Sequence, residues 1–184
     1  MRKPVYKYPD FVSKVTLKND EKKRYWLNVE IDKEKDESIL VILKNPSRAT
    51  KEISDKTVFN VCNYIHRNQS RFLELKNIGN VIFLNLITNY ETYSDKLQVI
   101  KDEIIDKENL MTINDFCGKH KKVIIAWGNH PSGLYNEYQI LKSSTMEILT
   151  KNESEVFFVD KMSNIGNPKH GQVWGYKNEL IGLK

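Results

Sequence analysis

The sequence predicts an α/β domain of three layers, in which helices cover both faces of a central, mainly parallel sheet of four strands. Runs of four or five β-branched and aromatic residues, bounded by polar residues, Gly or Pro, are typical of strands buried on both faces. Strands that alternate with helical patterns favour a parallel sheet. The runs that meet this description cover residues 39–43, 81–84, 123–126 and 156–159.

The segments before the first run predict an arm and an edge strand. Residues 1–24 are polar and irregular, which predicts a short arm laid over a single domain of residues 25–184. In residues 25–31 apolar and polar side chains alternate, as in a half-buried strand at the edge of a sheet. The charged residues 32–37 then predict a solvated hairpin turn into the first core strand.

Helices are predicted between the apolar runs. Ser54-Asp55 is a suitable helix start, and apolar residues follow at helical spacing as far as Ile65. Cys62 belongs to this apolar face and is expected in the core. Further helical patterns cover residues 94–104, 110–118 and 135–149.

The composition is that of one globular domain without a membrane segment. Of 184 residues, 29% are charged and 40% hydrophobic, as in ordinary soluble proteins. Met1–Pro4 lacks the apolar core of a signal peptide, and no apolar run approaches a membrane span. Cys62 and Cys117 are too few for a disulfide framework or a zinc site. We expect a cytoplasmic protein without a membrane partner, and the sequence does not indicate its oligomeric state.

The formal net charge of +5 favours a polyanionic partner such as nucleic acid. The basic residues are spread along the chain, for example over residues 14–24 and 119–122, and each group equally fits a solvated face. Charge alone therefore leaves nucleic-acid binding and an ordinary basic surface both open.

Asn45-Pro46-Ser47 directly follows the first predicted core strand. Ligands of parallel α/β sheets bind beyond the carboxyl ends of the strands, so this is the place to seek function. Pro46 fixes the backbone, and the Asn45 amide can both donate and accept hydrogen bonds, so it can orient a water or a ligand. The alternative is that Asn-Pro is a common turn dipeptide.

Asn85 interrupts the apolar run of residues 81–87. A polar side chain there is costly unless its hydrogen bonds are satisfied. One hypothesis is an amide that reads a polar edge of a ligand. The other is a strand-end residue bonded to neighbouring loop backbone.

Two later segments also follow predicted strands. Trp127-Gly128 ends the third run, where Gly permits close backbone approach and Trp either walls a pocket or fills the core. Pro168 and Gly171 flank His170, which predicts an ordered loop for this histidine. A single loop histidine is still more often structural than catalytic.

Several signatures of other enzyme classes are missing from the sequence. It has no dinucleotide-binding glycine motif, Walker loop, nucleophile elbow or His-Glu-x-x-His motif. The sequence therefore does not favour nucleotide-dependent group transfer, metal-dependent hydrolysis or hydrolysis by a catalytic triad. We expect no cofactor and no metal.

Taken in order, the motifs resemble the domain-of-unknown-function 1643 family over about residues 24–176. The resemblance depends on Asn45-Pro46-Ser47-Arg48-Ala49, Asp55-Lys56-Thr57, Asn85-Leu86, Ala126-Trp127-Gly128 and Gly166-Asn167-Pro168-Lys169-His170. The chain departs from the family pattern at Lys44, Lys56 and Gly171, where Leu, Pro and Pro are expected.

The same order of motifs is similar to that of the uracil-DNA glycosylase superfamily, which implies its parallel sheet and a nucleobase site. By that likeness Asn45 would position the attacking water, Asn85 would read the base, and His170 would stabilise the departing base. The remaining predicted site residues are Pro46, Ser47, Trp127 and Gly128 around the base, and Lys44, Arg48 and Lys169 as nucleic-acid contacts. Residues 130–134 resemble the superfamily's last motif, but they come one strand too early, and Ser47 replaces the usual Gly.

Three functions follow as hypotheses. The first is hydrolysis of an N-glycosidic bond to a nucleobase in DNA or a nucleoside, without a metal. The second is a nucleic-acid-binding module that has lost the chemistry. The third is an accessory protein that acts through a protein partner and exposes a large apolar patch.

Overall fold

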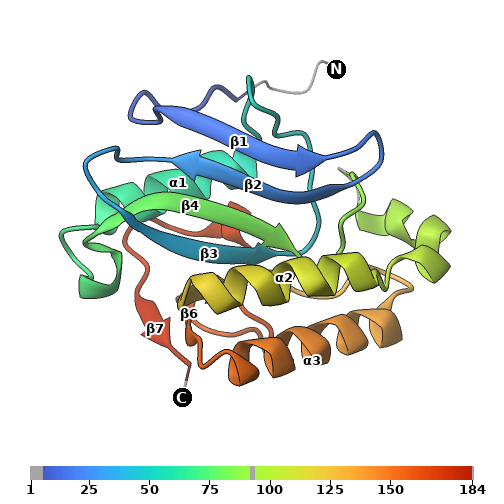
Figure 1. Cartoon of the computed structure of the whole chain (residues 1–184). Coiled ribbons are helices and arrows are strands. Elements are labelled where there is room, and N and C mark those ends of the chain that lie inside the picture. The colour runs from blue at the N-terminus through green and yellow to red at the C-terminus, as the bar shows by residue number, and fades with distance from the viewer. Residues whose placement is uncertain (1–5, 92–93, 184) are drawn as a thin grey trace.

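The computed structural model describes residues 6–91 and 94–183, which form one seven-stranded mixed sheet with helices on both faces (Figure 1). The strand order is β1-β2-β4-β3-β5-β6-β7. The strands are β1 (Lys14–Asn19), β2 (Arg24–Glu30), β3 (Glu37–Leu43), β4 (Ile78–Asn85), β5 (Lys122–Ile125), β6 (Glu155–Val159) and β7 (Leu180–Gly182). The helices are α1 (Lys56–Asn68), α2 (Lys107–Lys119) and α3 (Tyr135–Lys151), with 3-10 segments η1 (Leu73–Leu75), η2 (Ser94–Glu103) and η3 (Gly171–Val173).

The predicted α/β class is confirmed, but the predicted number of strands is wrong. The four apolar runs form β3, β4, β5 and β6, and each neighbouring pair in the order β4-β3-β5-β6 is parallel. β1, β2 and β7 extend this group with antiparallel pairs. β1 and β7 were missed because none of their residues is buried, so neither strand has the continuous apolar run of a buried strand.

β2 is not the edge strand that the alternating pattern predicts, because it lies between β1 and β4. Residues 14–19, inside the predicted irregular arm, form the outer strand β1. Residues 32–36 do not make a hairpin either, because β4 lies between β2 and β3. Alternation of apolar and polar residues is the same in an edge strand and in the strand beside it, so the sequence pattern could not distinguish them.

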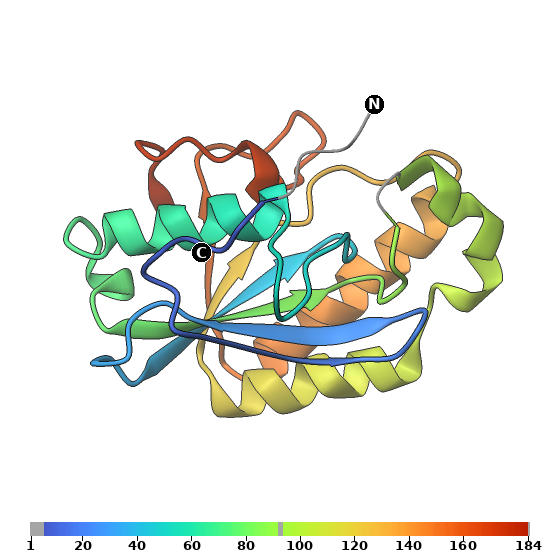
Figure 2. The same ribbon diagram turned by 90° about the horizontal axis from the view of Figure 1, so that it is seen from above.

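The two faces of the sheet carry separate cores, and helices cover both of them (Figure 2). Val41 and Phe83 belong to the core under α1, whereas Ile42 and Leu84 belong to the core under α2 and α3. This alternation along neighbouring strands follows from the two-residue period of a β-strand. The same alternation determines on which face of the sheet each side chain near the strand ends lies.

The helices match the predicted segments except for η2. Asp55 is the N-cap of α1, and its Oδ1 accepts a hydrogen bond from the backbone N–H of Val58 at 2.9 Å. The segment after Ser94 is a 3-10 helix that is broken at Ile100, where φ is −109° and ψ is 26°. No helix of the described residues is long and apolar enough to cross a membrane.

Candidate functional site

A cavity of about 330 Å³ lies beyond the carboxyl end of β3, beside the amino terminus of α1. Such a position is where ligands bind in parallel α/β sheets. Segments far apart in the sequence form its walls. The lining residues are Tyr6, Lys44, Asn45, Ser47, Arg48, Asp55, Lys56, Thr57, Glu91, His170 and Gln172.

Asn45 lines the cavity with a fixed amide. Its Nδ2 donates to the backbone carbonyls of Glu91 at 2.6 Å and Pro46 at 3.0 Å. Because both partners accept, the atom that faces them must be the nitrogen, so the amide orientation is settled. No described residue donates to Oδ1. Asn45 therefore offers an oriented acceptor, and the neighbouring Pro46 is buried.

His170 lines the same cavity and is neutral at physiological pH. Burial, followed by the nearby charge of Lys44, lowers the pKa of His170 to about 4. Its Nδ1 accepts a hydrogen bond from the backbone N–H of Gln172 at 3.3 Å. In a neutral imidazole the other nitrogen then carries the hydrogen, so Nε2–H is a donor.

Gly128 makes room for His170. A Cβ atom at Gly128 would lie 3.1 Å from the Cβ of His170, and the residue has φ +68°. Both the space and the left-handed backbone favour glycine at this position. Gly128 and His170 also line a second pocket of about 320 Å³ together with Lys169 and residues 161–164. His170 therefore lies between two hollows of the surface.

Asn85 does not line the cavity, although the strand register places it nearby. It pairs with Leu43 in the parallel ladder and follows Phe83 on the α1 face by the two-residue alternation. The side chain is fully buried, and neither Nδ2 nor Oδ1 has a hydrogen-bond partner among the described residues. The hypothesis that it bonds to loop backbone is therefore wrong. Contact with a ligand stays a prediction.

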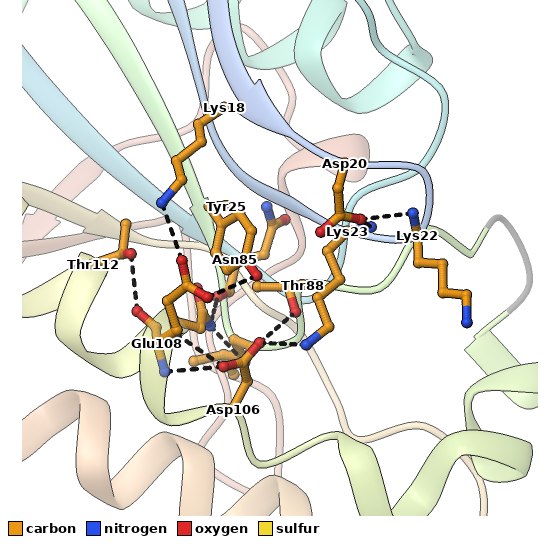
Figure 3. A network of polar contacts seen from close by, with 12 residues as sticks. Lys18, Asp20, Lys22, Lys23, Tyr25, Asn85, Thr88, Asp106, Glu108 and Thr112 are labelled. Carbon is orange, nitrogen blue, oxygen red and sulfur yellow. Dashed lines mark hydrogen bonds and ion pairs between the residues drawn. The ribbon is translucent and has the colours of Figure 1, made fainter.

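A polar network holds the backbone that follows Asn85 (Figure 3). Asp106 caps α2 through the backbone N–H groups of Glu108 and Asn109. Its Oδ2 accepts from Lys23 Nζ at 2.8 Å and from the Thr88 hydroxyl at 3.3 Å. Asn109 Nδ2 donates to the backbone carbonyl of Asn85 at 2.8 Å. This network joins the turn before β2, the loop after β4 and the start of α2, and so fixes the end of β4.

Several predicted site residues lie outside the cavity. Trp127 is buried in the core under α2 and α3, on the face opposite Asn45 and α1. Lys169 forms an ion pair with Asp160 and lines the second pocket. His130 lies in a loop, where its Nδ1 contacts the carbonyl of Pro131 at 3.1 Å, and it does not line the cavity.

The cavity also contains residues that sequence reasoning did not assign to a site. Tyr6 comes from the predicted arm, and its carbonyl accepts from the backbone N–H of Ser54 at 2.8 Å. Glu91 lies in a loop and Gln172 in η3, and neither belongs to a motif. Lys56 and Thr57 belong to the Asp-x-Thr motif, so this motif could have indicated that the start of α1 lines the cavity. The other contributions arise from tertiary contacts.

Among the described residues, no group of three or more His, Cys, Asp or Glu side chains is placed to hold a metal ion.

Comparison with known proteins assigns the chain to a family. No curated protein and no solved structure matches the chain. A family model described as "Protein of unknown function (DUF1643)" matches residues 24–171. The chain belongs to this family, as the order of its motifs predicts.

Proposed function

We propose that the protein hydrolyses an N-glycosidic bond and releases a nucleobase from a nucleoside, a nucleotide or a nucleic acid. The observation that carries the proposal is one pair of groups in one cavity. Asn45 offers an oriented acceptor, and neutral His170 offers a donor. Asn45 and His170 are far apart in the sequence, yet both line the cavity beyond the carboxyl ends of the parallel strands.

This pair suits the charges that develop in the reaction. Breaking an N-glycosidic bond builds positive charge on the sugar and negative charge on the base. The water oxygen bonds to the sugar carbon, and the proton that the water loses balances the proton that the base anion takes up from solvent. Asn45 Oδ1 would accept a hydrogen bond from the attacking water and direct its lone pair at the sugar. The Nε2–H of His170 would donate to the departing base, and a fixed donor at developing negative charge lowers the barrier.

The cavity provides space and an aromatic wall for a base. Its volume is at the lower end of the range of small-molecule sites, roughly 300–1,000 Å³. Tyr6 is one of the lining residues, and unstacked bases commonly lie on aromatic side chains. The motif order resembles that of the uracil-DNA glycosylase superfamily, which supports the same assignment. A base within a duplex would have to leave its stack to enter.

The position of Asn85 favours a second candidate, a nucleic-acid-binding module without catalysis. A base-reading amide is expected to reach the ligand, yet Asn85 is fully buried and does not line the cavity. In this alternative the chain binds through its basic residues and releases no base.

The deciding experiment measures base release from single- and double-stranded DNA and from nucleosides that carry uracil and modified bases. Wild type is compared with Asn45→Ala and with Asn136→Ala, an exposed position on α3. Release that is lost in Asn45→Ala and kept in Asn136→Ala supports hydrolysis. Salt-sensitive DNA binding without release supports the binding module instead. Release that Asn45→Ala retains would contradict the assigned role of Asn45.

A further inference from the structure

Three cations line the cavity without an ion pair. The ion pairs formed by the described residues use other lysines and arginines. Lys44, Arg48 and Lys56 have neither an ion pair nor a side-chain hydrogen bond within the described part of the chain. Lys44 is half-buried, whereas Arg48 and Lys56 are exposed. The cavity therefore has one ammonium in its wall and two cations at its mouth.

The ammonium of Lys44 lacks compensation for its lost hydration. Burial lowers its pKa, and no carboxylate contributes an opposing effect. The nearest acidic lining residue along the chain, Asp55, is nearly fully buried and accepts from the Val58 N–H at the start of α1. Withdrawing a charge from water is costly unless a partner replaces the water. An anion in the cavity would be such a partner.

The amino terminus of α1 lies in the same wall. The N–H groups of Lys56 and Thr57 have no partner within the helix, as in the first turn of any α-helix. The first turn contains no acidic residue, and its first position is a lysine. The carboxylate of the N-cap Asp55 lies at this helix end and accepts from the Val58 N–H, so the N–H groups of Lys56 and Thr57 are the donors that remain for a ligand. Thr57 and Ser47 add hydroxyl groups to the lining. Backbone N–H groups, hydroxyls and cations together are the donors that bind phosphate.

We propose that this cavity contains a phosphate subsite, in which Lys44 contacts a phosphate oxygen of the ligand while Arg48 and Lys56 attract it at the mouth. This inference rests on the proposed function, because it assumes that the rest of the ligand is a nucleoside. It narrows the substrate class to nucleotides and nucleic acids, as opposed to free nucleosides.

The test is equilibrium binding by calorimetry to matched ligands. The probes are nucleosides, their 5′-monophosphates, inorganic phosphate and a short single-stranded oligonucleotide. We expect the phosphate group to raise affinity about tenfold or more, as one charge-assisted hydrogen bond does. Lys44→Met is expected to remove most of this advantage, because it keeps the apolar stem and loses the charge. Lys119→Met, which removes an exposed lysine at the end of α2, is expected to keep it.

The two sources of phosphate are separated by the oligonucleotide. If the ligand is a nucleic acid, the oligonucleotide binds more tightly than any mononucleotide, and Lys44→Met lowers the salt slope of its affinity by about 0.7. If the ligand is a nucleotide, the monophosphate binds as tightly as the oligonucleotide. Both outcomes support a phosphate subsite.

Equal affinity for nucleosides and their monophosphates would overturn the inference. So would an unchanged phosphate advantage in Lys44→Met, or failure of every phosphate-bearing probe to bind wild type. Release from free nucleosides, lost in Asn45→Ala, would then leave the proposed hydrolysis standing. A phosphate advantage without base release would have the opposite meaning, because the subsite would stand and hydrolysis would fail.

Discussion

Replacing Asn85 with leucine is expected to stabilise the protein. The Asn85 side chain is fully buried, and both of its polar atoms lack a hydrogen-bond partner among the described residues. Leucine has the same number and branching of side-chain heavy atoms, so it keeps the shape of the amide, although its methyl groups are larger than the amide oxygen and nitrogen. Replacing an unsatisfied amide by an apolar group of the same shape removes a desolvation penalty of about 1–3 kcal/mol.

This gain in the free energy of unfolding corresponds to a measurable rise in the melting temperature, Tm. For a domain of this length, each 1 kcal/mol shifts Tm by about 2–4 °C, so Asn85→Leu should raise Tm by roughly 2–12 °C. Thermal unfolding followed by circular dichroism and calorimetry measures the shift. If Asn85 also contacts the ligand, the same variant loses base release while gaining stability, as active-site residues that trade stability for function do.

Asn109→Leu is the matched control. Asn109 is also fully buried, but its Nδ2 donates to the backbone carbonyls of Asn85 at 2.8 Å and Leu86 at 3.2 Å. Leucine there would leave those carbonyls without their donor, which costs about 1–3 kcal/mol for each. Tm should therefore fall in this variant. A fall in Tm for Asn85→Leu as well would refute the reasoning, because it would mean that the Asn85 amide has a stabilising partner.

Three further outcomes are expected. Because the pKa of His170 falls to about 4 in the folded chain, below its ordinary value of about 6.5, the unfolded chain binds more protons between these pH values. The free energy of unfolding should therefore be highest above about pH 6.5 and should decrease by up to about 3 kcal/mol as the pH falls to 4. In His170→Gln, urea unfolding should show a free energy that depends less on pH over this range. Asp55→Ala should lose about 1 kcal/mol through the missing N-cap of α1, whereas Asp55→Asn should retain most of it, as denaturant midpoints will show. Trp127→Phe should lower Tm through a smaller buried side chain yet leave base release intact, because Trp127 packs on the face opposite the cavity; a specific loss of release at unchanged folding would place it in the site.

The buried polar groups near the cavity divide into two kinds. Asn109 and Asp106 have several partners each and hold the end of β4 against α2. Asn85 has no side-chain partner, and Lys44 has no ion pair in the described part of the chain. Groups of the first kind stabilise the fold, whereas groups of the second kind reduce its stability.

The sequence by itself determined the elements that depend on local patterns. The four parallel strands follow from continuous apolar runs, and α1 from the N-cap residue Asp55 and a 3.6-residue apolar period. Asn45 was found because polar residues directly after buried strands collect at one edge of a parallel sheet, and His170 because Pro168 and Gly171 flank it in the loop after the fourth apolar run. These signals lie within short stretches of sequence, where neighbouring residues decide the outcome.

Tertiary structure alone decided which of the post-strand residues meet. Trp127 follows a strand as Asn45 does, but the two-residue alternation turns its side chain to the other face of the sheet. Tyr6 enters the cavity through backbone pairing with Ser54, and no local pattern encodes such a contact between distant segments. The inward position of Lys44 likewise depends on the packing of α1 and the His170 loop around it, so a single lysine after a strand could not reveal it.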